Sequence, residues 1–251
     1  MAAGPSIDAL GQFRLAAGFG TAGGKVDFTN SNVMMLVSAV LIVLLFALGV
    51  RKRALVPGRL QASAEMGYEF VVNLCRESIG EGWEPFFPFI FTLFFFILFG
   101  NLIGDFPLFF AFTSHIAVTA ALAILVFVLT IIVGFVYHGL RFFTFFVPPG
   151  VPKIVAPLLV PIEVLTFFSR PVSLSIRLFA NIVAGHVLWE VFAGFMLMFA
   201  AALGAVGVVA AVLPLAVNVA LVGFEILVSV LQAYVFAILA CIYLYDAVHL
   251  H

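Results

Sequence analysis

The sequence predicts an all-α integral membrane protein with about five membrane helices and one amphipathic helix at the membrane surface. Of its 251 residues, 65% are hydrophobic and only 9% are charged, whereas soluble domains carry about 25% charged residues. The apolar residues form long uncharged runs, and about 20 such residues are enough to cross a bilayer as a helix. A formal net charge of −1 gives no indication of nucleic acid as a partner, so the expected environment is the lipid bilayer.

The first part of the chain predicts an external segment, one span and one interfacial helix. Segment 1–32 is mixed in composition and lacks the basic and apolar pattern of a signal peptide. Residues 33–50 form an uncharged apolar run, and basic residues follow at 51–53. The positive-inside rule places these basic residues on the cytoplasmic or matrix side and the N-terminus outside. In 61–84, charged and apolar residues recur with a spacing that fits an amphipathic helix at the interface.

Two further apolar runs, 86–112 and 115–140, predict a hairpin of two spans. Asn101 lies toward the outer end of the first run. Arg141 and Lys153 follow the second run, which returns the chain to the side of the first basic cluster. The two basic clusters therefore agree on one topology.

The last third contains two unusually long apolar runs, 154–200 and 203–248, each of about 45 residues. A helix of that length would measure about 67 Å, although the hydrocarbon core is about 30 Å thick. Each run could divide into two ordinary spans, but Pro214 is the only strong helix breaker in 203–248. We therefore expect two long, steeply inclined helices that form a hairpin. They complete a single membrane domain over 33–251, with the C-terminus on the cytoplasmic side.

Arg177 is the charge that fits its surroundings least. It lies inside an apolar run, and none of residues 178–251 is Lys or Arg. A guanidinium at the centre of a membrane helix costs about 3 kcal/mol, so such a residue is a functional candidate by default. Ser173, Arg177 and Asn181 follow one another at four-residue spacing, which places them on one helix face. No chain neighbour neutralises Arg177, so its partner is expected elsewhere.

A second polar stripe is predicted on the last helix. Asn218, Glu225 and Gln232 recur every seven residues, and seven residues return to nearly the same azimuth, with a drift of about 20°. Such groups can simply join helices by hydrogen bonds worth about 1 kcal/mol each. Glu225 favours a function more strongly, because a buried carboxyl group tends to hold a proton. His186, with an ordinary pKa of about 6.5, is suited to passing protons to it from a facing helix.

Glu163, Arg170 and Arg177 follow one another at seven-residue spacing on the first long helix. Glu163 and Arg170 would lie nearer the cytoplasmic end. They would line either a hydrated outlet path or an interfacial salt-bridge network. Arg177 keeps its proton, so beside a proton path it would act as a barrier and as a docking point for a carboxylate.

The remaining candidates are weaker. Glu190 follows His186 by four residues and would extend the outer path or simply be solvated. Asp105 and Asn101 are similar candidates at the outer end. Cys75 and Cys241 are far apart in sequence and form no motif, so we expect two thiols that behave as small hydrophobes. The sequence contains no phosphate loop, metal-ligand motif or catalytic triad pattern. We therefore expect no catalytic site, cofactor or metal on this chain.

Two motifs resemble those of the a-subunit family of F-type ATP synthases. Segment 173–186 is similar to the motif around that family's essential Arg, and segment 225–236 is similar to its second motif, as is the ending 243–246. The combination of His186 with Glu225 resembles alphaproteobacterial and mitochondrial members. Asp105 lies one residue away from the family's usual acidic position.

The resemblance implies a proton-translocating subunit of a bacterial inner (plasma) membrane, or alternatively of the mitochondrial inner membrane. Its partners would be a ring of c subunits, the peripheral-stalk b subunits and the rest of the ATP synthase complex. Protons would enter one half-channel, cross the membrane on the ring and leave by another, with Arg177 between the two. A proton-coupled secondary transporter is the alternative, but no internal repeat supports it. The implied inlet residues are Asn181, His186, Glu225 and Gln232, and the implied outlet residues are Ser173, Arg170 and Glu163.

Overall fold

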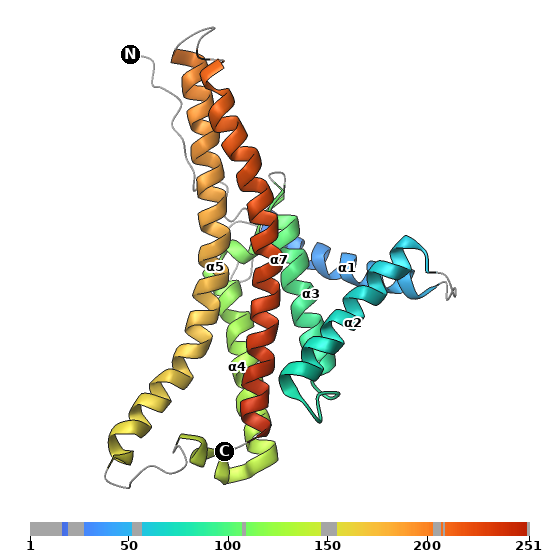
Figure 1. The fold of residues 1–251 in the computed structure, drawn as a ribbon, viewed down its shortest axis with the longest axis vertical. Helices are drawn as coiled ribbons and strands as arrows, with labels where there is room; N and C mark the ends of the chain where they lie inside the picture. Colours follow the sequence, from blue (N-terminus) through green and yellow to red (C-terminus); the bar gives the residue numbers. More distant parts are fainter. Residues whose placement is uncertain are drawn as a thin grey trace. The chain divides into compact units, whose positions relative to one another are not determined.

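A computed structural model describes residues 17–19, 28–51, 57–106, 109–146, 155–202, 207 and 209–249. Within these ranges, five helices are long and apolar enough to cross a membrane. The predicted all-α membrane fold is therefore confirmed, and a sixth, more polar helix accompanies the five (Figure 1). The apolar helices are α1 (Asn30–Arg51), α3 (Phe87–Gly104), α4 (Ile116–His138), α5 (Ala156–Ala202) and α7 (Val212–Val248), and the polar one is α2 (Arg59–Ile79).

The remaining elements are short. The strands β1 (Ala17–Phe19) and β2 (Phe28–Thr29) pair antiparallel, a feature that the sequence did not predict for segment 1–32. The rest of 1–27 lies outside the described residues. Two 3-10 helices flank α4, namely η2 (Phe112–Ser114) before it and η3 (Gly139–Phe146) after it.

The chain comprises two compact units whose boundaries fall within helices. Unit 1 consists of Met1–Leu41, Ile97–His115 and Phe179–Gln232. Unit 2 consists of Ile42–Phe96, Ile116–Leu178 and Ala233–His251. Each of the helices α1, α3, α5 and α7 therefore contributes residues to both units.

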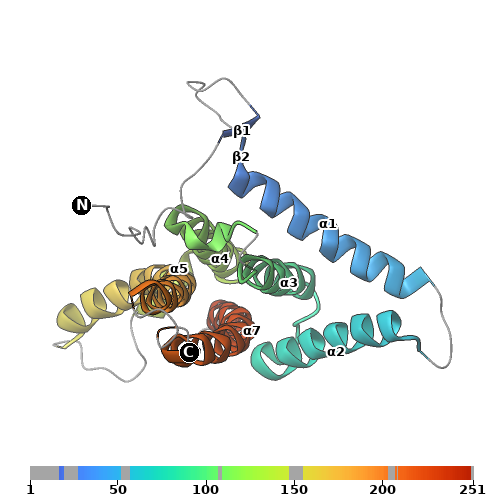
Figure 2. The ribbon, with the colours of Figure 1, turned by 90° about the horizontal axis from the view of Figure 1, so that it is seen from above.

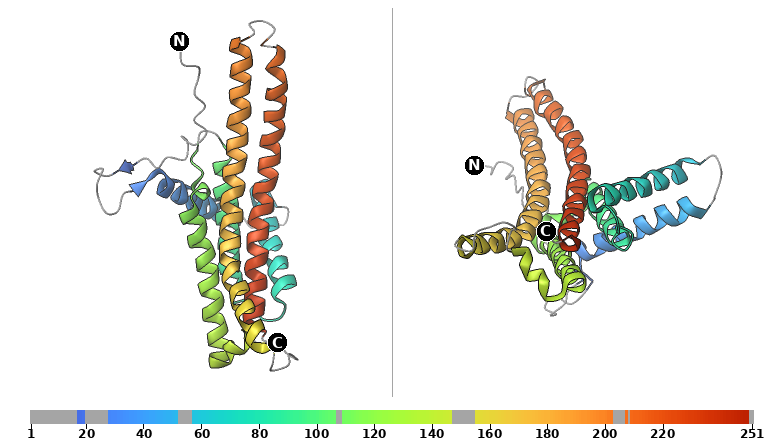
Figure 3. Two further views of the ribbon diagram at one scale, coloured as in Figure 1. Left: turned by 90° about the vertical axis from the view of Figure 1, so that its left-hand side faces the viewer. Right: turned by 60° about the horizontal axis from the view of Figure 1, so that its bottom comes forward.

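In unit 1, the second part of α5 and the first part of α7 run side by side (Figures 1 and 3). The predicted span over 86–112 is shorter in the structure, because α3 ends at Gly104. Its last turn is closed by the Asp105 N–H, which donates to the Asn101 carbonyl at 2.8 Å. A Cβ placed on Gly104 would lie 2.7 Å from the Ala111 Cβ. Gly104 thus lets the chain after α3 fold back closely against the helix end.

In unit 2, α2 packs beside the adjoining parts of α1 and α3 (Figure 2). A Cβ on Gly49 of α1 would lie 2.7 Å from the Ala64 Cβ of α2, and one on Gly67 would lie 2.8 Å from the Phe95 ring of α3. Small residues therefore permit close helix approach here. Helix α2 ends at Ile79 and is capped by Gly80, whose φ of 76° suits glycine. It therefore stops before the end of the predicted 61–84 segment.

Two polar contacts join other helices of unit 2. The Thr119 and Ser175 hydroxyl oxygens lie 3.2 Å apart between α4 and α5, and the His138 ring lies 2.9 Å from the Val248 carbonyl of α7. The fully buried Cys75 and Cys241 also share a hydrogen bond between α2 and α7. These thiols were expected to be buried hydrophobes, and their proximity across 166 residues of sequence was not predicted.

Candidate functional site

Unit 1 brings together two residues predicted to face each other on the long helices. Glu225 lies on α7 and His186 on α5, and the Glu225 Oε1 is 3.9 Å from the His186 Nε2. Their side chains are 10% and 5% exposed, respectively. The backbone of Gly104, at the end of α3, also forms a hydrogen bond with His186. Gly185 leaves room for the Glu225 carboxylate, which lies directly over its Cα.

Asp105 completes a cluster that sequence reasoning did not assemble. One ligand-type atom from each of Asp105, His186 and Glu225 lies within 4.8 Å of the other two. Among the described residues, neither Asp105 oxygen has a hydrogen-bond partner of good geometry. Burial raises the pKa of Asp105 to about 6, and the nearby Ser229 hydroxyl opposes that rise. A proton can therefore be gained or lost by this carboxyl group near neutral pH.

Two cavities adjoin the cluster. The Asp105 cavity has a volume of about 220 Å³ and is lined by the three clustered residues together with Phe106, Trp189, Val222 and Ile226. The Asn181 cavity has a volume of about 140 Å³ and lies between α5 and α7. Glu225 lines both cavities. Each has room for several waters, since a water occupies about 30 Å³ in the liquid.

Carboxylates and imidazole are also the side chains that bind zinc. Ligand atoms about 2.0–2.1 Å from a tetrahedral metal lie about 3.3 Å from one another, closer than the 3.9 Å between His186 and Glu225. The cluster is therefore more open than a formed metal site. Its spacing instead suits proton transfer through one intervening water.

The other predicted residues of unit 1 differ in their burial and in their contacts. The buried Asn101 side chain donates to the Ser229 carbonyl at 3.4 Å, which ties α3 to α7. Asn218 and Gln232 are buried on α7, and each has one polar atom without a hydrogen-bond partner among the described residues. Asn181 lines the Asn181 cavity. Glu190 is half-buried and is not among the residues that line the Asp105 cavity.

In unit 2, Arg177 lies on an exposed face of α5. Among the described residues, no carboxylate forms an ion pair with it. Its charge acts on Tyr243 of α7, which carries no opposite charge at neutral pH. Ser173 is exposed on the same helix, and Glu163 is half-buried. The guanidinium is therefore presented outward, without an acidic partner from this chain.

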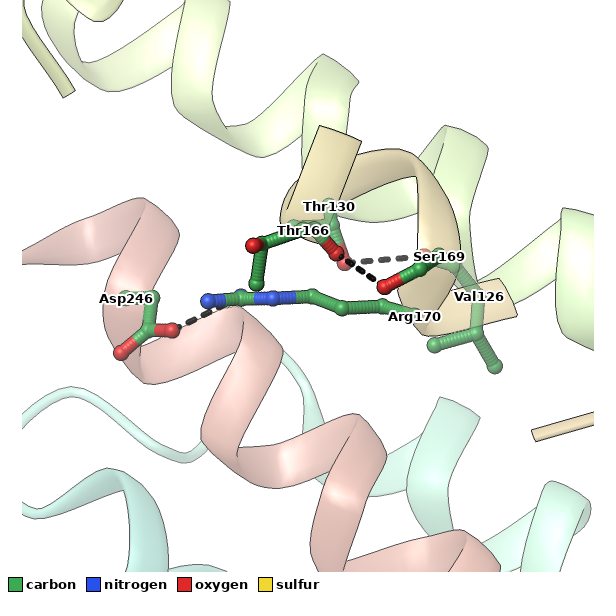
Figure 4. A network of polar contacts seen from close by, with 6 residues as sticks. All are labelled: Val126, Thr130, Thr166, Ser169, Arg170 and Asp246. Carbon is green, nitrogen blue, oxygen red and sulfur yellow. Dashed lines mark hydrogen bonds and ion pairs between the residues drawn. The ribbon is translucent and has the colours of Figure 1, made fainter. Parts of the chain in front are cut away.

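Arg170 has the opposite environment (Figure 4). Its Nη1 lies 2.9 Å from the Asp246 Oδ2, and the two side chains are 20% and 21% exposed. The guanidinium also lies 5.0 Å from the Tyr243 ring centroid and 5.7 Å from that of Phe167. Of the two alternatives left open by the sequence, this geometry favours an ion pair, although the acid is Asp246 and not Glu163.

The sequence matches a known protein family over most of its length. The ATP synthase A chain family matches residues 32–245. The chain belongs to this family. The family expected from the two helix motifs is thereby confirmed.

Full-length relatives within the ATP synthase A chain family agree with this assignment. The chain is 62% identical to the ATP synthase subunit a of Acidiphilium cryptum and 61% identical to that of Granulibacter bethesdensis, in each case over 100% of both chains. It is 50% identical to the ATP synthase subunit a of Mesorhizobium japonicum, over 97% of both chains. The similarity therefore extends beyond the motifs to the whole chain.

Proposed function

We propose that this chain acts as the a subunit of an F-type ATP synthase and guides protons to and from a rotating ring of c subunits. The observation that carries the proposal is a contrast between the polar groups of unit 1 and those of unit 2. A buried cluster of proton-binding groups lies in unit 1, whereas an outward-facing guanidinium without an acidic partner lies in unit 2. The chain thus offers proton carriers at one place and a fixed positive charge at another.

The inlet half-channel is assigned to unit 1. Asn181, His186, Glu225 and Gln232 would line it, with Asn218 and Asn101 as further polar groups. Water in the two cavities would carry protons to the His186–Glu225 pair, because groups too far apart for a direct hydrogen bond exchange protons through one water. Glu190 is assigned to the outer side of this path. From there the proton would pass to a carboxylate of the ring.

Arg177 is assigned to the boundary between the two half-channels. Its guanidinium stays charged at any physiological pH, and it is exposed on α5. A deprotonated ring carboxylate would be attracted to it, whereas a protonated one is neutral and can cross lipid at much lower cost. The fixed charge would also repel protons, which prevents a direct leak from inlet to outlet.

The outlet half-channel is assigned to the part of α5 that lies in unit 2. Ser173 and Glu163 would face it, and Arg170, held by Asp246, would form a fixed part of its wall. In this arrangement the N-terminus lies outside and the C-terminus on the cytoplasmic side of a bacterial inner membrane. The chain carries no catalytic site of its own, and it binds the c-ring and the peripheral-stalk b subunits.

The test is the substitution Arg177→Ala in the assembled complex. Inverted membrane vesicles are prepared, and ATP-driven acidification is followed by quenching of a pH-sensitive dye. We expect assembly and ATP hydrolysis to remain while proton pumping is lost. The matched control is Arg59→Ala, which removes an exposed guanidinium from α2 and should leave pumping unchanged. Normal proton pumping by Arg177→Ala would refute the proposed function. It would also remove the reason for preferring that function over a secondary transporter.

A further inference from the structure

Asp105 lies where a carboxylate does not help the fold. It follows the last residue of α3, at the negative end of the helix dipole, and no basic residue occupies the last turn of that helix. Its oxygens are buried and have no hydrogen-bond partner of good geometry among the described residues. A negative charge here is unfavourable for stability both because of the dipole and because of desolvation. Helix capping therefore does not explain why an acid is present.

The position of the acid has a steric explanation. A side chain on Gly104 would place its Cβ 2.7 Å from the Ala111 Cβ and 3.0 Å from the Ala111 Cα. The second distance involves backbone, which cannot rotate away as a flexible side chain can. Position 104 therefore has no room for an acidic side chain. The carboxylate stands instead on the next residue, within 4.8 Å of both His186 and Glu225.

We propose that Asp105 is a third proton-carrying residue of the inlet, acting with His186 and Glu225 through the water of the Asp105 cavity. The inference rests on the proposed function and adds a residue to it. A proton arriving from the water binds the Asp105 carboxylate. The neutral carboxyl group then gives that proton to the His186 ring or to the Glu225 carboxylate, either directly or through one water, and becomes a carboxylate again.

The proximity of the two acids couples the protonation of one to that of the other. Two carboxylates this close disfavour being charged together, so the pair tends to hold one shared proton. A proton taken up by Asp105 weakens the hold of Glu225 on its own proton. Release from Glu225 toward the Asn181 cavity, which it also lines, then leaves the pair ready for the next proton. Uptake on one side is thereby coupled to release on the other.

The experiment compares Asp105→Asn and Asp105→Glu in the complete complex in membrane vesicles. Asp105→Asn keeps the shape of the side chain but cannot carry a proton. We expect proton flux to fall by less than the about hundredfold that follows loss of a sole general acid or base, because two of three carriers remain. Asp105→Glu should restore most of the flux. The matched control is Glu77→Gln, which neutralises an exposed acid on α2 and should leave flux unchanged.

Assembly and thermal stability separate transport from a structural role. The inference predicts that Asp105→Asn lowers flux while the amount and stability of the complex stay equal or increase. Unchanged flux would overturn it, as would a loss of flux that only follows a loss of assembled complex. Glu225→Gln and Arg177→Ala are measured in parallel. If those two lose transport and Asp105→Asn does not, Asp105 is excluded and the proposed function stands; if all three transport normally, the proposed function fails as well.

Discussion

Units 1 and 2 each contain acidic and basic residues on α5 and α7, but the two units differ in whether these groups form a close ion pair. In unit 2, Arg170 and Asp246 form a 2.9 Å ion pair bordered by aromatic rings. In unit 1, His186 and Glu225 remain 3.9 Å apart, and Asp105 is buried beside them without a good hydrogen bond. A satisfied pair fixes two helices against each other. A buried acid such as Asp105, with a cavity beside it and no hydrogen bond of good geometry among the described residues, would under the proposed function bind and release protons.

The largest effect on transport within unit 1 is expected for Glu225→Gln. The amide cannot carry a proton, and Glu225 is the residue that lines both cavities. We expect proton-driven ATP synthesis in vesicles to fall at least about a hundredfold, in the range known for loss of a general acid or base. Thermal stability should change little, because the carboxylate Oε1 has no hydrogen bond to lose among the described residues. Unchanged ATP synthesis by Glu225→Gln across pH 6 to 8 would contradict a proton-carrying role for the unit 1 cluster, in contrast to the ion pair of unit 2.

Arg170→Ala is expected to show the reverse pattern, with stability affected more than transport. It leaves Asp246 without its partner and removes contacts with three described rings, at a cost of about 2 kcal/mol for such a half-buried pair. The measurement is the thermal denaturation of the purified complex. The double variant Arg170→Met with Asp246→Leu should recover part of the loss, because it leaves no charge unpaired. The single variants Arg170→Met and Asp246→Leu complete a double-mutant cycle. If their losses of thermal stability simply add in the double variant, a direct pairing is contradicted.

The smallest effect is expected for the stability of Asp105→Asn as a function of pH. The folded-state pKa of Asp105 is raised from 3.8 to about 6, so the folded protein binds a proton more tightly than the unfolded chain. Stability from this group is therefore full below pH 3.8 and declines as pH rises to about 6. Above that pH, Asp105→Asn should raise stability by about 1–2 kcal/mol, after discounting for partial exposure. The free energies of unfolding of the two proteins should converge in acid. A constant difference at every pH would contradict the raised pKa of Asp105 as its cause.

Local patterns were enough to predict much of this molecule. The apolar runs predicted five long helices, and the charge pattern of 61–84 predicted an amphipathic helix, because both depend on residues close in sequence. Heptad spacing placed Asn218, Glu225 and Gln232 on one stripe of α7. The pairing of His186 with Glu225 on facing helices was also expected from the sequence, and the structure brings the two side chains within 3.9 Å.

The remaining features depend on contacts that no local pattern contains. Arg170 meets Asp246 across 76 residues of sequence, and the choice of Asp246 over Glu163 depends on how α5 and α7 are aligned. Asp105 follows α3 and joins residues of α5 and α7 in the unit 1 cluster, and beside it Gly104 lets Ala111 approach the end of α3. A glycine in an apolar run indicates that close approach is possible, but it does not say which residue approaches.

The position of Glu225 between two cavities also bears on which ions can pass. Under the proposed function, the same carboxyl group would bind a proton from the Asp105 cavity and release it to the Asn181 cavity, because it lines both. A hydrated sodium or potassium ion would face a higher cost on this path, because it would have to lose water and displace a side chain that is 10% exposed. Under the proposed function, one carboxylate placed between two small cavities would pass protons in preference to larger cations, without any ring of selective ligands.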